Sequence, residues 1–307
     1  MKCSKCNMDA VAHQPYSGAH LCRKHLIEDV ERKVKKDIRQ LQMVEKNDSI
    51  AVALSGGKDS VVLLYLLHKL FSKRPDITLF AVTIDEGISG YREHTIEIAQ
   101  KVTDMLGIQL HVISMKGELG KSLDEVAAEE RDKGACSFCG VFRKKLLNMT
   151  ARKLGATKLA VGHNLDDEAQ TAFLNVLRGD VGRMSRMHKK QQGLVYRIKP
   201  LRSVPEKEVA LYAILQNLPV DFSECPYAHE AMRGEVRDII NSIEVKHPGT
   251  KYSILRGSDE TARLLNIAQQ DVTLSVCSVC GEPTAAEVCQ SCRLLGQKQD
   301  MVDFVKG

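Results

Sequence analysis

The chain has 307 residues, of which 43% are hydrophobic and 27% charged, and a formal net charge of +5. This composition is ordinary for a globular protein, and no apolar run approaches the roughly 20 residues that cross a bilayer, which excludes a membrane-embedded protein. The N-terminus has no apolar segment typical of a secretory signal, so we expect a cytoplasmic protein with one large domain and small appendages.

The N-terminus is dense in cysteine and histidine, and reduced cysteines in close pairs indicate a metal site rather than disulfides. Two ligand pairs with the same spacing are what tetrahedral Zn²⁺ requires. His25 is preferred to His13 and His20, because its spacing repeats that of the first cysteine pair. We therefore predict a zinc module at 1–28, with the ligands Cys3, Cys6, Cys22 and His25.

After a charged, helix-like stretch at 28–46, short β-branched runs alternate with amphipathic segments. Strands are expected at 50–54, 79–84, 110–113 and 158–161. Helices are expected at 61–71, 94–106 and 140–154. This alternation predicts an α/β fold with a doubly wound parallel sheet, in which the loops after Leu54, Ile84 and Val161 converge on one ligand site.

The remaining sequence divides into a helical part at about 224–265 and a second cysteine-rich module. Two C-x2-C pairs form a complete four-thiolate set, with the predicted Zn²⁺ ligands Cys277, Cys280, Cys289 and Cys292. We thus predict three parts, at 1–28, 29–268 and 269–307. Both zinc sites are closed, and a closed zinc site supports folding rather than chemistry.

A strand, two glycines and an apolar helix follow one another at 50–71. Gly56 and Gly57 allow backbone N–H groups to face an anion, and Lys58 adds a positive charge. The loop is not the P-loop of kinases and GTPases, because Val52 and Asp59 replace the required Gly and Ser or Thr. A nucleotide phosphate is favoured over a plain tight turn.

Acidic residues end two other expected strands. Thr83, Ile84 and Asp85 end the second strand, where a carboxylate can meet a ribose or the adenine edge. Asp166 or Asp167, after the fourth strand, can hold Mg²⁺ against the phosphates, or can act as a helix N-cap.

Three cysteines remain outside the two zinc sets. Cys136 and Cys139 precede an expected helix, whose dipole favours a thiolate, and Cys225 lies in a Glu-Cys-Pro-Tyr turn. They form either a third zinc site completed by His229, a redox pair with a spectator thiol, or a [4Fe–4S] cluster with one iron not held by protein.

Basic residues gather at 32–36, 143–145 and 178–199, which favours binding of a polyanion. The non-enzymatic alternative is a zinc-containing RNA-binding protein with a vestigial loop. The retained Lys58, Asp59 and paired aspartates argue against it.

The motif SGGKDS at 55–60 resembles that of the PP-loop ATP pyrophosphatases, which split ATP between the α- and β-phosphates. With the zinc sets and the motifs at 136–144, 162–167, 177–180, 224–227 and 277–284, the chain closely resembles the tRNA 2-thiolation proteins of the NcsA type, and more loosely the TtuA thiolases. The resemblance implies a homodimer that thiolates a tRNA uridine, with sulfur from a ubiquitin-like carrier or inorganic sulfide. The motifs at 139–144 and 177–180 favour the wobble uridine over the T-loop uridine. A PP-loop amide-forming synthetase is the enzymatic alternative.

The resemblance assigns roles to individual residues. The [4Fe–4S] cluster would be held by Cys136, Cys139 and Cys225. The residues expected to contact ATP and Mg²⁺ are Ala53, Leu54, Ser55, Gly56, Gly57, Lys58, Asp59, Ser60, Thr83, Ile84, Asp85, Gly162 and Asp167. Catalysis is assigned to Cys136, Cys139, Cys225, Lys58, Asp59 and Asp166.

Overall fold

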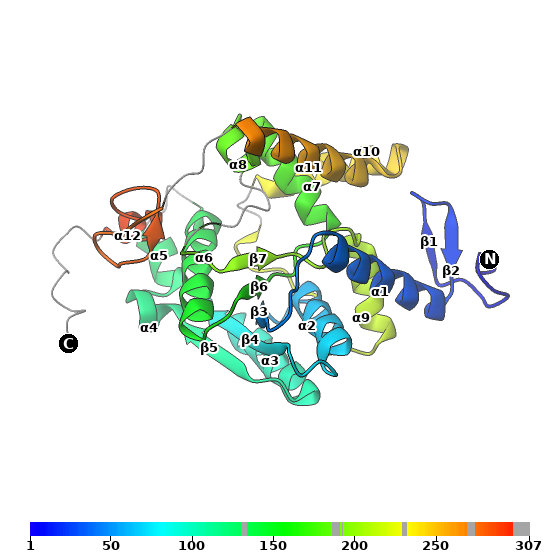
Figure 1. The fold of residues 1–307 in the computed structure, drawn as a ribbon, viewed down its shortest axis with the longest axis horizontal. Coiled ribbons are helices and arrows are strands. Elements are labelled where there is room, and N and C mark those ends of the chain that lie inside the picture. Colours follow the sequence, from blue (N-terminus) through cyan, green and yellow to red (C-terminus); the bar gives the residue numbers. More distant parts are fainter. Residues whose placement is uncertain (130–133, 186–190, 192, 229–231, 269–273, 297–307) are drawn as a thin grey trace.

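A computed structural model describes residues 1–129, 134–185, 191, 193–228, 232–268 and 274–296. Its centre is a five-stranded parallel sheet in the order β5-β4-β3-β6-β7 (Figure 1). The strands are β3 (Ser49–Ala53), β4 (Thr78–Asp85), β5 (Leu110–Ser114), β6 (Lys158–Ala160) and β7 (Tyr196–Ile198). The predicted doubly wound parallel sheet is confirmed, although β7 was not predicted from the sequence.

The direction in which the sheet is wound reverses between β3 and β6. The chain lays β4 and β5 on one side of β3 and then crosses to the other side for β6 and β7. Ligands of open α/β sheets bind beyond the carboxyl ends of the strands at such a switch point. Val52 of β3 lies opposite Ala160 of β6, so the loops that follow these strands start side by side.

Three helices of the sheet domain begin earlier than their apolar periodicity indicates. They are α2 (Lys58–Phe71), α3 (Arg92–Leu106) and α6 (Ala135–Lys153), against expected starts at 61, 94 and 140. The first turns of α2 and α3 are polar, which explains the late starts expected there. In α6 the buried Ala135 and Phe138 already follow the helical spacing of Phe142. The correction matters in α6, because Cys136 and Cys139 lie within the helix rather than before it.

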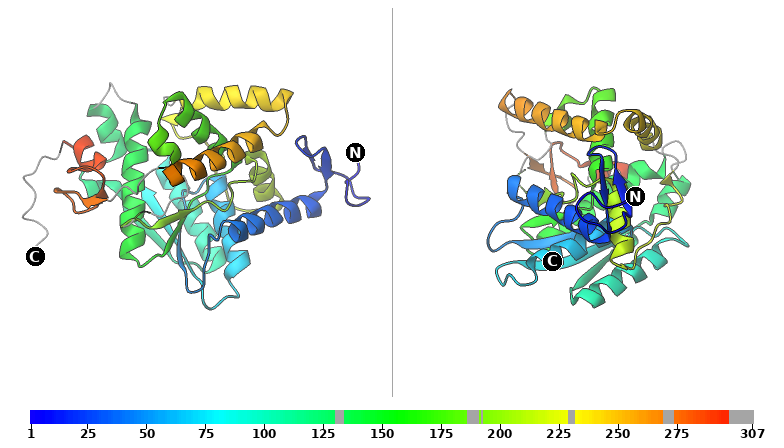
Figure 2. Two further views of the ribbon diagram at one scale, coloured as in Figure 1. Left: turned by 45° about the horizontal axis from the view of Figure 1, so that its top comes forward. Right: turned by 90° about the vertical axis from the view of Figure 1, so that its right-hand side faces the viewer.

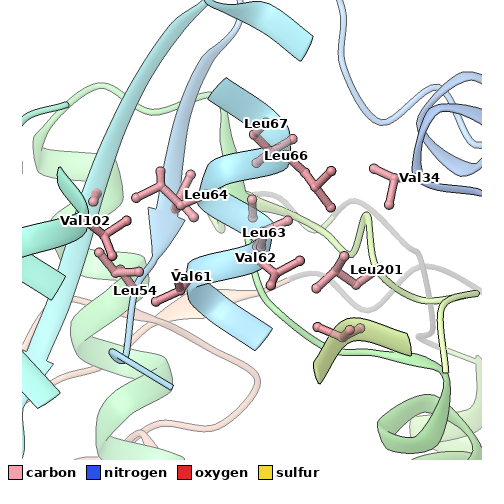
Figure 3. Close-up of a cluster of buried hydrophobic side chains, with 14 of the residues drawn as sticks. Val34, Leu54, Val61, Val62, Leu63, Leu64, Leu66, Leu67, Val102 and Leu201 are labelled. Atoms are coloured by element: carbon pink, nitrogen blue, oxygen red, sulfur yellow. The ribbon is translucent and has the colours of Figure 1, made fainter. Parts of the chain in front are cut away.

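Side chains of β3 alternate between two cores. Ile50 and Val52 pack with α2 and with α9 (Glu206–Leu215), whereas Ala51 packs with α6 on the other face. Helix α2 is buried on several sides, and its leucines meet Val34 and Leu201 (Figure 3). Burial on this scale stabilises α2 strongly and fixes the loop at its N-terminus.

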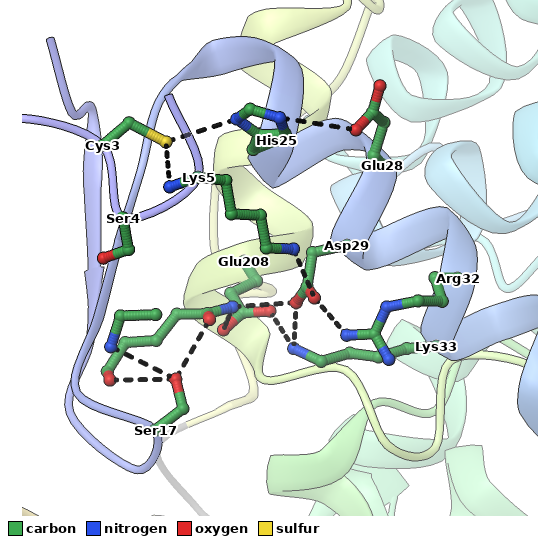
Figure 4. Close-up of polar contacts among 12 residues, drawn as sticks. Cys3, Ser4, Lys5, Ser17, His25, Glu28, Asp29, Arg32, Lys33 and Glu208 are labelled. Atoms are coloured by element: carbon green, nitrogen blue, oxygen red, sulfur yellow. Dashed lines mark hydrogen bonds and ion pairs between the residues drawn. The ribbon is translucent and has the colours of Figure 1, made fainter. Parts of the chain in front are cut away.

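The N-terminal module consists of the hairpin β1 (Ala12–Gln14) and β2 (Ala19–Leu21), followed by α1 (Arg23–Gln40). Helix α1 runs from the module onto the core, so the boundary predicted at residue 28 falls inside it. The buried carboxylate of Glu208 accepts hydrogen bonds from Gln14 at 2.9 Å and from Lys33 at 2.6 Å (Figure 4). Lys33, part of a predicted basic cluster, is thus engaged inside the protein.

The C-terminal module contains β8 (Ser275–Val276), β9 (Pro283–Thr284) and α12 (Gln290–Leu294). It packs against α6, where Arg152 forms an ion pair with Glu282 and Lys145 lies 3.8 Å from the Sγ of Cys292. The hairpin β1–β2 and the C-terminal module lie at opposite ends of the long axis (Figures 1 and 2).

The other helices complete the domain. Two short ones lie beside α6, namely α4 (Met115–Leu119) and α5 (Leu123–Glu129). A helical layer is formed by α7 (Leu165–Leu177), α8 (Val181–Ser185), α10 (Arg233–Lys246) and α11 (Thr250–Ala268). In the part of the chain that the structure describes, every helix is too short or too polar to span a membrane.

Candidate functional site

The loop between β3 and α2 is shaped for an anion. Gly56 has a φ of +88°, and a Cβ there would lie 2.2 Å from the carbonyl oxygen of Thr95, so the position requires glycine. Gly57 caps α2 without a side chain that bonds to its first N–H groups. Because unbonded N–H groups and the helix dipole attract anions, the loop fits a phosphate.

Hydrogen bonds and close backbone contacts hold this loop in place. The hydroxyl of Ser60 accepts from the backbone N–H of Ser55 at 3.1 Å and donates to the carbonyl of Gly57 at 2.9 Å. The loop after β6 approaches so closely that a Cβ at Gly162 would lie 3.0 Å from the backbone of Asp59 and Ser60. The two loops at the switch point are therefore in contact, as the sequence predicted.

Lys58, the first residue of α2, lies between two carboxylates. Its Nζ is 3.0 Å from Oδ2 of Asp59 and 2.7 Å from Oε1 of Glu206. Burial lowers the pKa of Lys58, but Asp59 and Glu206 raise it by more than burial lowers it. The net shift is therefore upward, and the side chain stays an ammonium ion. Burial raises the pKa of Asp59, although Lys58 and the amide of Asn164, at 3.0 Å, oppose the shift.

Asp166 and Asp167 face different partners. The N-cap of α7 is Asn164, not either aspartate, and it forms a capping box with Asp167. Asp166 is buried, accepts from the backbone N–H of Glu206 at 2.9 Å and pairs with Lys251. Asp166 is thus connected to the nucleotide loop through Glu206, which holds Lys58. Asp167 stabilises the start of α7, and its charge also acts on Asp59 of the loop.

The end of β4 lies next to the loop, since Ala53 is paired with Val82. The buried side chain of Arg92 donates to the carbonyl of Ser55 at 2.9 Å and to the hydroxyl of Thr83 at 2.9 Å. Arg92 therefore ties the loop to β4. Arg92 could not be predicted from the sequence, because an arginine at the start of a helix carries no distinctive signal.

The other residues expected to contact a nucleotide have mixed environments. The side chains of Leu54 and Ile84 are buried in the two cores, which leaves only their backbones for a ligand. Asp85 ends β4 and accepts from the backbone N–H of Gly87 at 2.9 Å. Its carboxylate is half-buried at the carboxyl edge of the sheet.

Two of the three remaining cysteines lie in the first two turns of α6, and the third lies between α9 and α10. The Sγ of Cys136 donates to the carbonyl of Tyr227 at 3.0 Å, which brings the Glu-Cys-Pro-Tyr turn to the start of the helix. Cys139 and Cys225 both pack against the core on the α6 face of the sheet.

The surroundings of Cys139 combine burial with several charges. Burial raises the pKa of its thiol to about 11, although the charge of Arg143 opposes the shift. The charges of Glu86, Cys225 and Cys136 add to the rise, so the three cysteines lie within electrostatic reach of one another. Burial of Cys139 therefore acts against the helix dipole, which favours a thiolate at this end of α6.

The two sets of predicted zinc ligands come together at the ends of the chain. In each set the ligand atoms lie within 4.8 Å of one another. The Sγ atoms of Cys6 and Cys22 are 3.7 Å apart, and so are those of Cys280 and Cys289. Tetrahedral Zn²⁺ with bonds of about 2.3 Å places two sulfurs about 3.8 Å apart, so both sets could hold zinc.

Backbone N–H groups also point at these thiols. The N–H of Lys5 donates to Cys3 at 3.4 Å, and that of Cys289 donates to Cys277 at 3.2 Å. Such bonds favour the thiolate form that zinc binds.

Among the described residues, only the two terminal sets meet this 4.8 Å spacing, so Cys136, Cys139 and Cys225 are spread more widely. A four-iron cluster is larger than a single ion, and its thiolates lie correspondingly further apart. His229, the alternative fourth ligand of a third zinc site, lies outside the described residues.

Two family models match the chain. Residues 27–241 match a model described as the PP-loop domain, and residues 2–27 match the N-terminal LIM domain of the 2-thiouridine synthetase TtuA. The tRNA 2-thiolation protein NcsA of Haloferax volcanii is 42% identical, over 96% of this chain and 98% of its own length. The chain belongs to the PP-loop family of tRNA 2-thiolation proteins. The resemblance expected from the motifs is thereby confirmed.

Other tRNA 2-thiolation proteins of this family match along almost the whole chain. The tRNA-5-methyluridine(54) 2-sulfurtransferase of Pyrococcus horikoshii is 33% identical, over 98% of this chain and 96% of its own length. A solved structure is described as the U34-tRNA thiolase NcsA from Methanococcus maripaludis with its [4Fe-4S] cluster. It has a TM-score of 0.84 and 39% identity, and the match covers 96% of this chain and 95% of that one.

Proposed function

We propose that the chain is an ATP-dependent tRNA-uridine 2-sulfurtransferase. The observation that carries this proposal is the connection between the nucleotide loop and the three cysteines. Arg92, which binds the carbonyl of Ser55, also pairs with Glu86 at 2.7 Å. Glu86 lies 3.7 Å from Arg143, one turn after Cys139 in α6. The nucleotide loop and the helix that carries Cys136 and Cys139 are therefore connected at one edge of the sheet.

Replacing a uracil oxygen by sulfur requires activation, because this oxygen is a poor leaving group. The base O2 attacks the α-phosphorus of ATP, the N3 proton is released, and pyrophosphate leaves with the electron pair of the broken P–O bond. Hydrosulfide then adds to C2, AMP leaves, and the proton of the hydrosulfide returns to N3. Lys58 and the N–H groups of Gly56 and Gly57 stabilise the phosphate charge that develops, and Asp59 holds Lys58 in place.

The donor sets fit the groups that this reaction needs. Cys136, Cys139 and Cys225 would hold a [4Fe–4S] cluster, whose iron without a protein ligand supplies a binding place for sulfide. Asp166 or Asp167 would hold Mg²⁺; Asp166 is paired with Lys251, and Asp167 is engaged in the capping box. Each terminal set would hold one Zn²⁺ with four protein ligands, which stabilises its module.

A group of cations beside α6 supports a tRNA partner. The guanidinium of Arg197 donates to the carbonyl of Lys144 at 3.2 Å. Desolvation lowers the pKa of Lys144, and the charges of Arg197 and Arg183 lower it further, so these cations lie close together. Assembled cations of this kind favour phosphate groups. Three other members of this basic stretch, Arg186, Lys189 and Lys190, lie outside the described residues.

Within this function we favour the wobble uridine over the T-loop uridine. The motifs at 139–144 and 177–180 support it, as does the higher identity to NcsA, 42% against 33% for the enzyme named for uridine 54. A homodimer is proposed, with sulfur from a ubiquitin-like carrier or inorganic sulfide. An amide-forming synthetase is disfavoured, since it has no use for three gathered cysteines.

The test is mass analysis of tRNA nucleosides from a strain that lacks the protein. We expect 2-thiouridine derivatives to disappear, and to return with the wild-type chain but not with Lys58→Ala. An unchanged nucleoside profile would refute the proposal. Release of pyrophosphate from ATP that depends on tRNA would exclude a protein that only binds RNA.

A further inference from the structure

Lys251 lies in the first turn of α11, beyond residues 27–241 that match the PP-loop domain. Its ammonium pairs with Asp166, which also accepts from the backbone N–H of Glu206 at 2.9 Å. The carboxylate of Glu206 in turn holds Lys58 at 2.7 Å. Lys58 and Lys251 therefore belong to one polar network at the carboxyl edge of the sheet.

The position of Lys251 is fixed by its neighbours. Glu244 accepts from the backbone N–H of Gly249 at 2.7 Å and from that of Lys251 at 2.8 Å. The hydroxyl of Tyr252 donates to the carbonyl of Ser203 at 3.0 Å. The Lys251 side chain is only 13% exposed. This is a cation held at one place, unlike a surface lysine that samples many rotamers.

The strand order indicates which part of a nucleotide Lys251 would meet. Neighbouring strands run in the order β4, β3 and β6. The expected ribose or adenine contact, Asp85, ends β4, and the phosphate loop follows β3. Asp166, which holds Lys251, follows β6. A nucleotide that binds across this edge with its base at β4 and its phosphates at β3 points its terminal phosphates towards β6 and Lys251.

We propose that Lys251 is a second phosphate-binding lysine, which binds the β- and γ-phosphates of ATP and stabilises pyrophosphate as it leaves. The inference rests on the proposed function, which supplies the nucleotide. Without nucleotide, Asp166 neutralises Lys251. A triphosphate carries more negative charge than one carboxylate, so the ammonium turns to its oxygens when ATP is bound. The role of Lys251 is charge and hydrogen bonding, without proton transfer.

The test compares the binding of ATP, AMP and inorganic pyrophosphate, each with Mg²⁺, to the full chain by calorimetry without tRNA. In Lys251→Met we expect ATP and pyrophosphate to bind at least about tenfold more weakly, the effect of one lost charge-assisted hydrogen bond. AMP should bind as it does to the wild type. Lys251→Arg, which keeps the charge, should restore most of the affinity for ATP.

The matched control is Lys246→Met, since Lys246 is an exposed lysine at the end of α10. It should leave the binding of all three ligands unchanged. Equal weakening of ATP and AMP by Lys251→Met would overturn the inference, because it would mean that Lys251 only shapes the site through Asp166. Unchanged ATP binding would overturn it as well.

A second variant covers a possible loss of stability. If Lys251→Met melts at a lower temperature than the wild type, Lys251→Gln replaces it, because an amide still donates to Asp166. The same comparison of ATP with AMP then decides. A wild-type chain that binds ATP but leaves tRNA unthiolated would refute the proposed function, and it would leave the role of Lys251 standing.

Discussion

Glu206 and Glu208 lie in the first turn of α9 and bind different parts of the molecule. Glu206 accepts from Lys58 of the nucleotide loop at 2.7 Å. Glu208 accepts from Gln14 of the N-terminal module at 2.9 Å and from Lys33 of α1 at 2.6 Å. One helical turn thus connects the N-terminal module with the phosphate site.

Glu208→Gln should therefore loosen the N-terminal module. The change leaves Lys33 without one of its two carboxylates inside the protein, and breaking a buried ion pair costs about 3 kcal/mol of unfolding free energy. Chemical denaturation measures this loss, and limited proteolysis should show faster cleavage near the β1–β2 hairpin. Glu97→Gln, an exposed site on α3, is the control. Equal stability and cleavage in both variants would contradict the connection.

Asp29 should contribute a stability that does not vary with pH near neutrality. Burial raises its pKa, but hydrogen bonds and charge from Gln14 and Lys33 outweigh burial and hold the pKa at about 2. A lowered carboxyl pKa gives stability that is full above the unfolded value of about 3.9 and is lost as the pH falls through the folded value.

Asp29→Asn should accordingly lower the unfolding free energy by about 2 kcal/mol, the equivalent of this pKa difference. The difference from wild type should be constant between about pH 5 and pH 8, where Asp29 is ionised in both states. Denaturation curves across this range provide the measurement. A difference that already shrinks between pH 8 and pH 5 would count against the assigned pKa.

Lys58→Ala should abolish tRNA thiolation while the protein stays folded. The side chain lies at the edge of the sheet and contributes phosphate charge, not core packing. Thiolation in vitro and the melting temperature are the two measurements. Lys69→Ala, near the other end of α2, removes an exposed ion pair with Glu31 and should keep the activity. A soluble, folded Lys58→Ala protein with wild-type thiolation would contradict the prediction.

Cys277→Ser should damage the C-terminal module before it affects chemistry. One lost ligand opens a four-coordinate site, so we expect the bound zinc to fall by about half and the melting temperature by at least about 4 °C. Metal analysis and thermal melting test this. Cys136→Ser is the control and should keep both zinc ions. An unchanged melting temperature and tRNA affinity would speak against a structural role.

Cys136, Cys139 and Cys225 should form one oxygen-sensitive [4Fe–4S] site. After anaerobic reconstitution, alanine at any of the three should lower iron, acid-labile sulfide and thiolation severalfold. Ser137→Ala, an exposed neighbour on α6, should leave the iron content intact. Stoichiometric zinc in place of iron, with thiolation preserved, would rule out the cluster. Thiolation that survives Cys225→Ala would remove that residue from the mechanism.

The parts of the site that could be predicted from the sequence are contiguous. An apolar strand, Gly56, Gly57, Lys58 and an apolar helix follow one another, so the local pattern carries both fold and chemistry. The two terminal ligand sets could be predicted for the same reason, because their spacing is itself the signal.

The parts that could not be predicted reach the site from a distance. Glu206 is 148 residues from Lys58, and Lys251 is 85 residues from Asp166. Neither residue belongs to a motif, and a charged residue on a helix usually faces water. β7 escaped prediction because only Ile198 of its three residues is buried, which is too short a pattern for a strand.

The contacts of the N-terminal module also set an order of events during folding. Cys3 and His25 are separated by 22 residues, whereas Gln14 and Glu208 are separated by 194. The cost of closing a loop grows with its length, and distant contacts form later than local ones. The ligands of the module can therefore meet early in synthesis, while its docking waits for α9. A chain stalled before α9 would carry a finished module whose attachment residues, Gln14 and Lys33, still face water and are open to chaperones and proteases.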